Sequence, residues 1–155
     1  MIEMREVAER LESVFGAPDT QSKFVLTTAC ETDLGQASIL GSPEAWKESW
    51  SRMINQKLVE WGRSPSQFES DGLASISKNA LSLACRFAMD SKKQHDTPPD
   101  RVIPTVDGGI AFHWEFQSPK GEIELQFNPS GSAELTGFLQ GNVILYKSYS
   151  RLHSS

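Results

Sequence analysis

Two runs of strictly alternating apolar and polar residues, between positions 110 and 127, constrain this chain more than any other feature. The apolar positions are Ile110, Phe112, Trp114 and Phe116 in the first run, and Ile123, Leu125 and Phe127 in the second. A period of two places these side chains on one face of a β-sheet and the intervening polar side chains on the other. We therefore predict that the apolar set is buried and that His113, Glu115 and Glu124 are exposed.

Short turn sequences separate a series of such strands. Asp107-Gly108-Gly109 precedes the first run, and further turns follow at 118–121, 128–131 and 140–142. Turns this short join antiparallel neighbours, so the pattern predicts a β-meander. Its strands are expected over 110–116, 122–127, 132–139 and 143–147, with a short edge strand over 101–103.

Three segments before the meander have helical periodicity, at residues 2–15, 43–61 and 71–92. Helices followed by strands indicate an α+β fold, with a four- to five-stranded antiparallel sheet packed on helix 71–92. We expect a single domain over 1–155, divided into a helical N-terminal elaboration (1–70) and a helix-plus-sheet part (71–155). Residues 19–41 carry no clear pattern apart from a short apolar run at 24–26.

Composition narrows the classes of function. The 155 residues include 15 basic and 20 acidic side chains, a net charge of −5, which argues against general nucleic-acid binding. The N-terminus lacks the pattern of a secretory signal, and no apolar run is long enough to span a bilayer. Cys30 and Cys85 fit no metal-binding spacing, so two free thiols in the cytoplasm are expected, with no disulfide, metal or cofactor.

Residues 99–115 carry the run PDRVIPT-x-DGGI-x-F-x-WE, after an alanine- and leucine-rich helix and before an acidic meander. This arrangement resembles a group of small bacterial proteins that have no assigned activity. The resemblance covers roughly the second half of the chain. It implies the same helix-plus-meander architecture and a bacterial or phage-related origin, and it implies no reaction, cofactor or partner.

Two groups of residues could carry chemistry. His113, Glu115 and Glu124 share the polar sheet face, where an imidazole and carboxylates could bind a metal or exchange protons. A solvated sheet face with alternating polar residues explains them equally simply, and we favour that interpretation. Cys30 could act as a nucleophile only with a histidine brought to it by the fold, and its acidic neighbours would raise its pKa.

A stripe of tryptophans on segment 43–61 is the best candidate for an interaction surface. Trp46, Trp50 and Trp61 lie at i, i+4 and i+15, with Arg52 and Lys57 on the same segment. Such a stripe usually packs in a core, but tryptophan and arginine are also common interface anchors. As a partner-binding surface, it should leave at least one indole partly exposed beside Arg52 or Lys57.

Three functions follow as hypotheses. The leading one is a non-enzymatic protein–protein interaction module, an antitoxin-, immunity- or adaptor-like partner of another bacterial protein. The second is an enzyme whose site is too dispersed to be seen in the sequence. The third is a nucleic-acid-associated factor that uses a local basic surface within residues 47–93.

Overall fold

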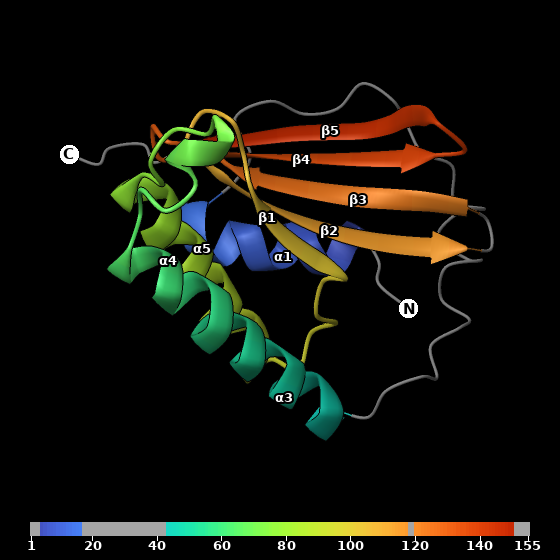
Figure 1. Cartoon of the computed structure of the whole chain (residues 1–155). Helices are drawn as coiled ribbons and strands as arrows, with labels where there is room; N and C mark the ends of the chain where they lie inside the picture. Colours follow the sequence, from blue (N-terminus) through green and yellow to red (C-terminus); the bar gives the residue numbers. More distant parts are fainter. Residues whose placement is uncertain (1–3, 17–42, 118–119, 151–155) are drawn as a thin grey trace.

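The computed structural model describes residues 4–16, 43–117 and 120–150 of the chain. The helical elements are α1 (Met4–Phe15), α3 (Pro43–Met53), the π-helical turn η1 (Ile54–Leu58), α4 (Val59–Arg63), the 3-10 turn η2 (Glu69–Asp71) and α5 (Lys78–Lys93). The strands are β1 (Arg101–Pro104), β2 (Ile110–Gln117), β3 (Lys120–Phe127), β4 (Ser132–Leu139) and β5 (Asn142–Ser150). The predicted α+β fold is confirmed (Figure 1).

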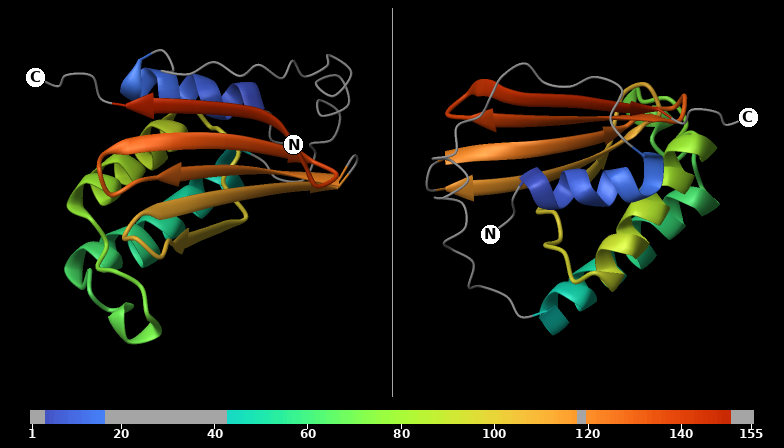
Figure 2. Two further views of the ribbon diagram at one scale, coloured as in Figure 1. Left: turned by 90° about the horizontal axis from the view of Figure 1, so that it is seen from above. Right: turned by 180° about the vertical axis from the view of Figure 1, so that it is seen from behind.

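The five strands form one antiparallel sheet in the order β1-β2-β3-β4-β5, which is the predicted meander. Helices α1 and α5 cover the same face of this sheet (Figure 2). The α3–η1–α4 segment runs as one continuous helix, because the residues at both junctions keep helical backbone angles. It packs against α5 and extends beside β1. The face of the sheet opposite α1 and α5, called the open face below, is covered by no described helix (Figures 1 and 2).

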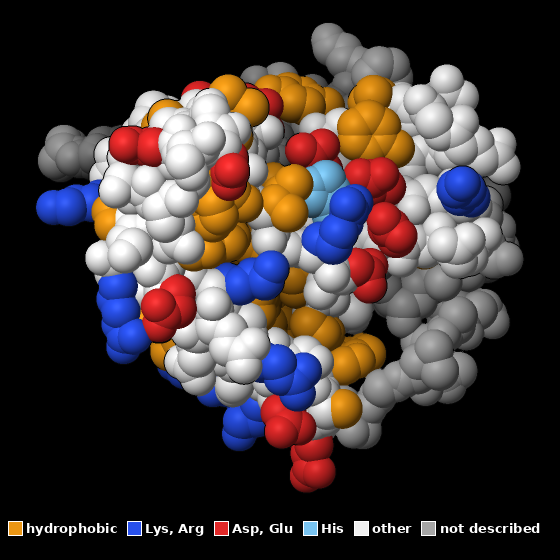
Figure 3. Space-filling model, viewed as in Figure 1, with side chains coloured by type: hydrophobic (Ala, Val, Ile, Leu, Met, Phe, Trp, Pro, Cys, Tyr) orange, Lys and Arg blue, Asp and Glu red, His pale blue; other side chains and the backbone are white. Residues whose placement is uncertain are grey.

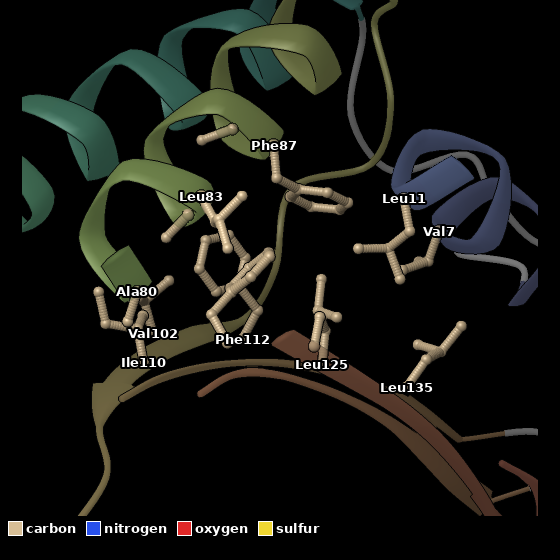
Figure 4. Packing of buried hydrophobic residues seen from close by; sticks show 14 of the residues in the cluster. Val7, Leu11, Ala80, Leu83, Phe87, Val102, Ile110, Phe112, Leu125 and Leu135 are labelled. Atoms are coloured by element: carbon tan, nitrogen blue, oxygen red, sulfur yellow. The ribbon is translucent and has the colours of Figure 1, made fainter. Parts of the chain in front are cut away.

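The core lies between the sheet and the two helices α1 and α5. Leu83 and Phe87 of α5 point toward Phe112, while Val7 and Leu11 of α1 point toward the β3 and β4 side of the sheet (Figure 4). The Phe87 ring lies 5.6 Å from the Phe112 ring in an edge-on arrangement that aromatic pairs favour. The predicted buried set is confirmed, since Phe112, Trp114, Ile123 and Leu125 are at most 1% exposed.

The predicted exposure of the polar set is partly wrong. Glu115 is exposed and Glu124 is half-buried, but His113 is only 8% exposed. His113 lies on the central part of β2, directly between Arg101 of β1 and Glu124 of β3. Its neighbours on both sides shield it, which an alternating pattern within one strand cannot indicate.

The third helix is shorter than predicted, because α5 begins at Lys78 and not near residue 71. Ser77 is its N-cap, and the Ser77 hydroxyl accepts hydrogen bonds from the backbone of Asn79 and Ala80. The residues just before α5 form neither helix nor strand, and the backbone N–H groups of Ala74 and Ser77 donate to the carbonyl oxygens of Val106 and Gly108. Because its backbone groups are used in these bonds, the segment before Ser77 forms a loop and does not extend α5.

Gly108 allows this loop to approach the sheet. Its φ of +95° is one that other residues rarely adopt, and a side chain there would lie 2.5 Å from the Ser75 carbonyl oxygen. The Asp107-Gly108-Gly109 turn therefore both starts β2 and holds the segment that leads into α5.

Candidate functional site

The predicted tryptophan stripe divides between core and surface. Trp50 is fully buried, and its Nε1 donates to the Asp96 carbonyl oxygen at 2.8 Å. Trp61 is 6% exposed and packs edge-on against Phe68. Neither indole is available to a partner, so these two predicted partner-binding residues belong to the core. Trp46, near the start of α3, is half-buried.

The other two predicted partner-binding residues, Arg52 and Lys57, line a groove. This α3–β1 groove has a volume of about 440 Å³ and lies between the α3–η1 helix and the segment that enters β1. Its lining residues are Ser49, Arg52, Met53, Gln56 and Lys57 on the helix, and Pro99, Asp100, Arg101, Val102 and Ile103 on the other side. Trp46 does not line it, so the half-buried indole is not part of the groove that the two cations line.

The π-helical turn positions one of these cations at the sheet edge. Lys57 lies within η1, and its Nζ donates to the Val102 carbonyl oxygen across the groove at 3.4 Å. Turns of π-helix are uncommon and are often found at functional sites. Because β1 is the edge strand of the described sheet, it presents backbone groups that no other described strand pairs.

Among the residues that the structure describes, three cations line the α3–β1 groove, and none of them forms a strong ion pair with another described residue. Arg101 contacts Glu115 at 3.4 Å, and both side chains are about half exposed. Arg52 is exposed and has no hydrogen bond or ion pair with any described residue. Asp100, the only acidic side chain among the described lining residues, already accepts a hydrogen bond from the Glu115 backbone at 2.6 Å.

The open face of the sheet has the opposite charge character. Figure 3 shows acidic side chains gathered around a histidine near the middle of this view, while basic side chains spread over the helical side below. A shallow cavity of about 830 Å³ lies at one end of the face, and Glu115, Glu122 and Glu124 contribute to its lining.

The one histidine of the sheet is held in place and is not presented to a ligand. His113 Nδ1 lies 3.0 Å from Glu122 Oε2, and because an ionised carboxylate only accepts, Nδ1 carries the proton. Nε2 is buried and has no partner among the described atoms. A general base needs a ring nitrogen that a substrate can reach, so this arrangement favours the structural interpretation of the polar face.

The described residues give no support to a metal site on the polar sheet face or to a cysteine nucleophile. Within residues 4–16, 43–117 and 120–150, no three His, Cys, Asp or Glu side chains are grouped to hold a metal ion. Cys30 lies outside the described residues. Cys85 is half-buried, and burial raises the pKa of its thiol, which disfavours the reactive thiolate.

The sequence did not predict the second wall of the α3–β1 groove, which residues 99–103 form. Arg101 and Ile103 were expected on an edge strand, and nothing in the local pattern placed that strand beside segment 43–61. The Pro98-Pro99 pair indicates extended backbone before the strand, but it does not indicate the direction in which the chain continues.

No helix in the described part of the chain is long and apolar enough to cross a membrane. The chain was also compared with known proteins. No protein-family model, no curated protein and no solved structure matches it.

Proposed function

We propose that this protein is a non-enzymatic protein-interaction module that binds a partner chain in the α3–β1 groove. The observation that carries the proposal is the pairing of an edge strand with Arg52, which lies across the same groove, is exposed and has no partner among the described residues. Arginine is enriched at interfaces, and sheet edges bind extended segments of other proteins.

Apolar surface in the same place supports this function. Ile103 is 39% exposed on β1 although it is a large aliphatic residue, and Met53 is half-buried on the facing helix. A polar rim around apolar contacts is the usual composition of a protein interface. An antitoxin-, immunity- or adaptor-like role in the bacterial cytoplasm is consistent with a small domain of this kind.

Site-specific photo-crosslinking tests the proposal. A photoreactive amino acid replaces Ile103 in the tagged protein, which is expressed in its native host and illuminated. Covalent adducts are then identified by mass spectrometry. We expect a discrete adduct with another protein, because a partner in the groove lies against this side chain.

Val143 provides a matched control position. It is 46% exposed on β5, at the opposite edge of the sheet. The same photoreactive residue at 143 should not give the adduct. An identical set of adducts at both positions, or none at 103 under conditions in which the protein is made and folded, would contradict the proposal.

A further inference from the structure

Building on the proposed function, we infer that the α3–β1 groove binds an extended segment of its partner that carries both carboxylates and apolar side chains. The inference names the chemistry of the partner segment, and it rests on the charge, the apolar surface and the shape of the groove.

The charge of the groove is complementary to carboxylates. Arg52, Lys57 and Arg101 contribute cations, and the carboxylate of Asp100 is engaged with the Glu115 backbone. A guanidinium has five N–H donors and an ammonium has three, so the single long contacts of Lys57 and Arg101 leave donors available. Carboxylates of a partner can therefore bind without the loss of a short hydrogen bond.

The apolar residues indicate that the segment is not uniformly acidic. Met53 lines the groove on the helix side with Arg52 and Lys57, and Ile103 lines it on the strand side with Arg101. Each wall therefore presents both kinds of group, and a segment that carries carboxylates and aliphatic side chains can contact both.

The position of β1 fits an extended partner backbone. β1 lies at the edge of the described sheet, and an extended segment can bind at a sheet edge through main-chain hydrogen bonds.

The same features argue against a nucleic acid in the groove. Single-stranded nucleic acids bind where aromatic side chains stack on the bases, and none of the described residues that line this groove is aromatic. The rim carries Asp100 and Glu115, and the whole chain has a net charge of −5, so the basic surface is local.

Fluorescence anisotropy with defined probes tests the inference. The first probe is a short fluorescein-labelled peptide in which glutamate alternates with leucine or valine. The second has glutamine at every glutamate position, and the third is a single-stranded oligodeoxythymidylate. We expect the glutamate peptide to bind on the order of tenfold more tightly than the other two, and its affinity to fall as salt is added.

Two double variants with equal changes of charge locate the binding. Arg52→Glu with Lys57→Glu should weaken binding of the glutamate peptide about tenfold or more. Lys47→Glu with Lys93→Glu changes two exposed lysines outside the groove and should have an effect of less than about twofold. If the first variant fails to fold, Arg52→Gln with Lys57→Gln removes the two positive charges without adding negative ones.

The outcomes separate the two proposals. Equal binding of the glutamate and glutamine peptides, or equal effects of the two double variants, would overturn the inference about the partner segment. If the glutamate peptide fails to bind while Ile103 still crosslinks to a native partner, the inference is wrong and the proposed function stands. Binding of the oligonucleotide that is lost on substitution of Arg52 and Lys57, with no protein adduct, would overturn both.

Discussion

The phenol ring of Tyr149 on β5 packs against the ring of Phe15 at the end of α1, with 5.9 Å between centroids and 40° between the ring planes. This contact connects the N-terminal helix to the last strand of the meander. Tyr149 is fully buried, and its hydroxyl has no hydrogen-bond partner among the described atoms. Burial of the hydroxyl raises the pKa of Tyr149 far above its usual range, and the nearby Glu12 adds to that effect.

Tyr149→Phe should leave the free energy of unfolding unchanged or raise it by up to about 1 kcal/mol, because it removes a buried donor that has no partner. Urea denaturation followed by circular dichroism measures the change. Tyr149→Ala, which also removes the ring contact with Phe15, should cost about 3–5 kcal/mol. A clear loss of stability in Tyr149→Phe would mean that the hydroxyl is hydrogen-bonded in solution.

The two tryptophans of α3 should differ sharply in their contribution to stability. Trp50 is fully buried and packs on Phe87 and Phe112, so Trp50→Ala should cost about 3–5 kcal/mol. Trp46 is half-buried, and Trp46→Ala should cost about 1 kcal/mol. Thermal unfolding of both variants gives the comparison, and similar losses would show that Trp46 is also part of the core.

Loss of the hydrogen bond between His113 and Glu122 should destabilise the fold more than loss of the neighbouring Glu124 side chain. Glu122→Ala removes the acceptor of a buried N–H and should cost about 1–2 kcal/mol. Glu122→Gln retains a carbonyl acceptor and should recover most of that loss.

Glu124→Ala is the matched control for this comparison. Glu124 lies directly opposite His113 on β3 but makes no hydrogen bond or ion pair with a described residue, so its effect should stay within about 0.5 kcal/mol. Chemical denaturation measures all three variants. A larger effect at Glu124 than at Glu122 would contradict the role assigned to the pair.

Asp96 should make stability depend on pH. Burial raises the pKa of Asp96 above its usual 3.8, and Arg10 of α1, whose Nε lies 2.5 Å from the carboxylate, only partly offsets this. The folded protein therefore holds the proton of Asp96 more tightly than the unfolded chain does. The resulting stabilisation is complete below the ordinary pKa and is lost as the pH rises through the raised one.

The stability of the natural protein relative to Asp96→Asn should consequently fall as the pH is raised from about 4 and then level off. Unfolding curves of the two proteins across this range provide the difference. Arg10→Met should steepen the fall, because it removes the cation that opposes the effect of burial. A difference that increases with pH would show that the ion pair with Arg10 outweighs the burial of Asp96.

The sequence by itself determined the elements and the register of the sheet. The large apolar residues of β2 and β3 face the core because a strand alternates its side chains, and a slip by one residue would expose Phe112 and Trp114 together. Helical periodicity likewise located α1 and the α3–η1–α4 helix. These are local properties, since they depend on residues a few positions apart.

Tertiary structure decided the features that depend on neighbours distant in sequence. Ser70, Asp71 and Ser77 could all cap the third helix, and only the hydrogen bonds of the preceding segment with the loop at 106–108 select Ser77. His113 has the position of a surface residue in its strand, yet β1 and β3 bury it from both sides.

The α3–β1 groove has the same origin. Trp46 and Trp50 follow one stripe of a helix, and only the position of Phe87 and Phe112 places Trp50 in the core. Arg52 and Arg101 are 49 positions apart in the chain, and they line one groove because α3 packs on α5 while β1 pairs with β2. Periodicity predicts which way a side chain faces within its own element, whereas the packing of elements determines what it meets there.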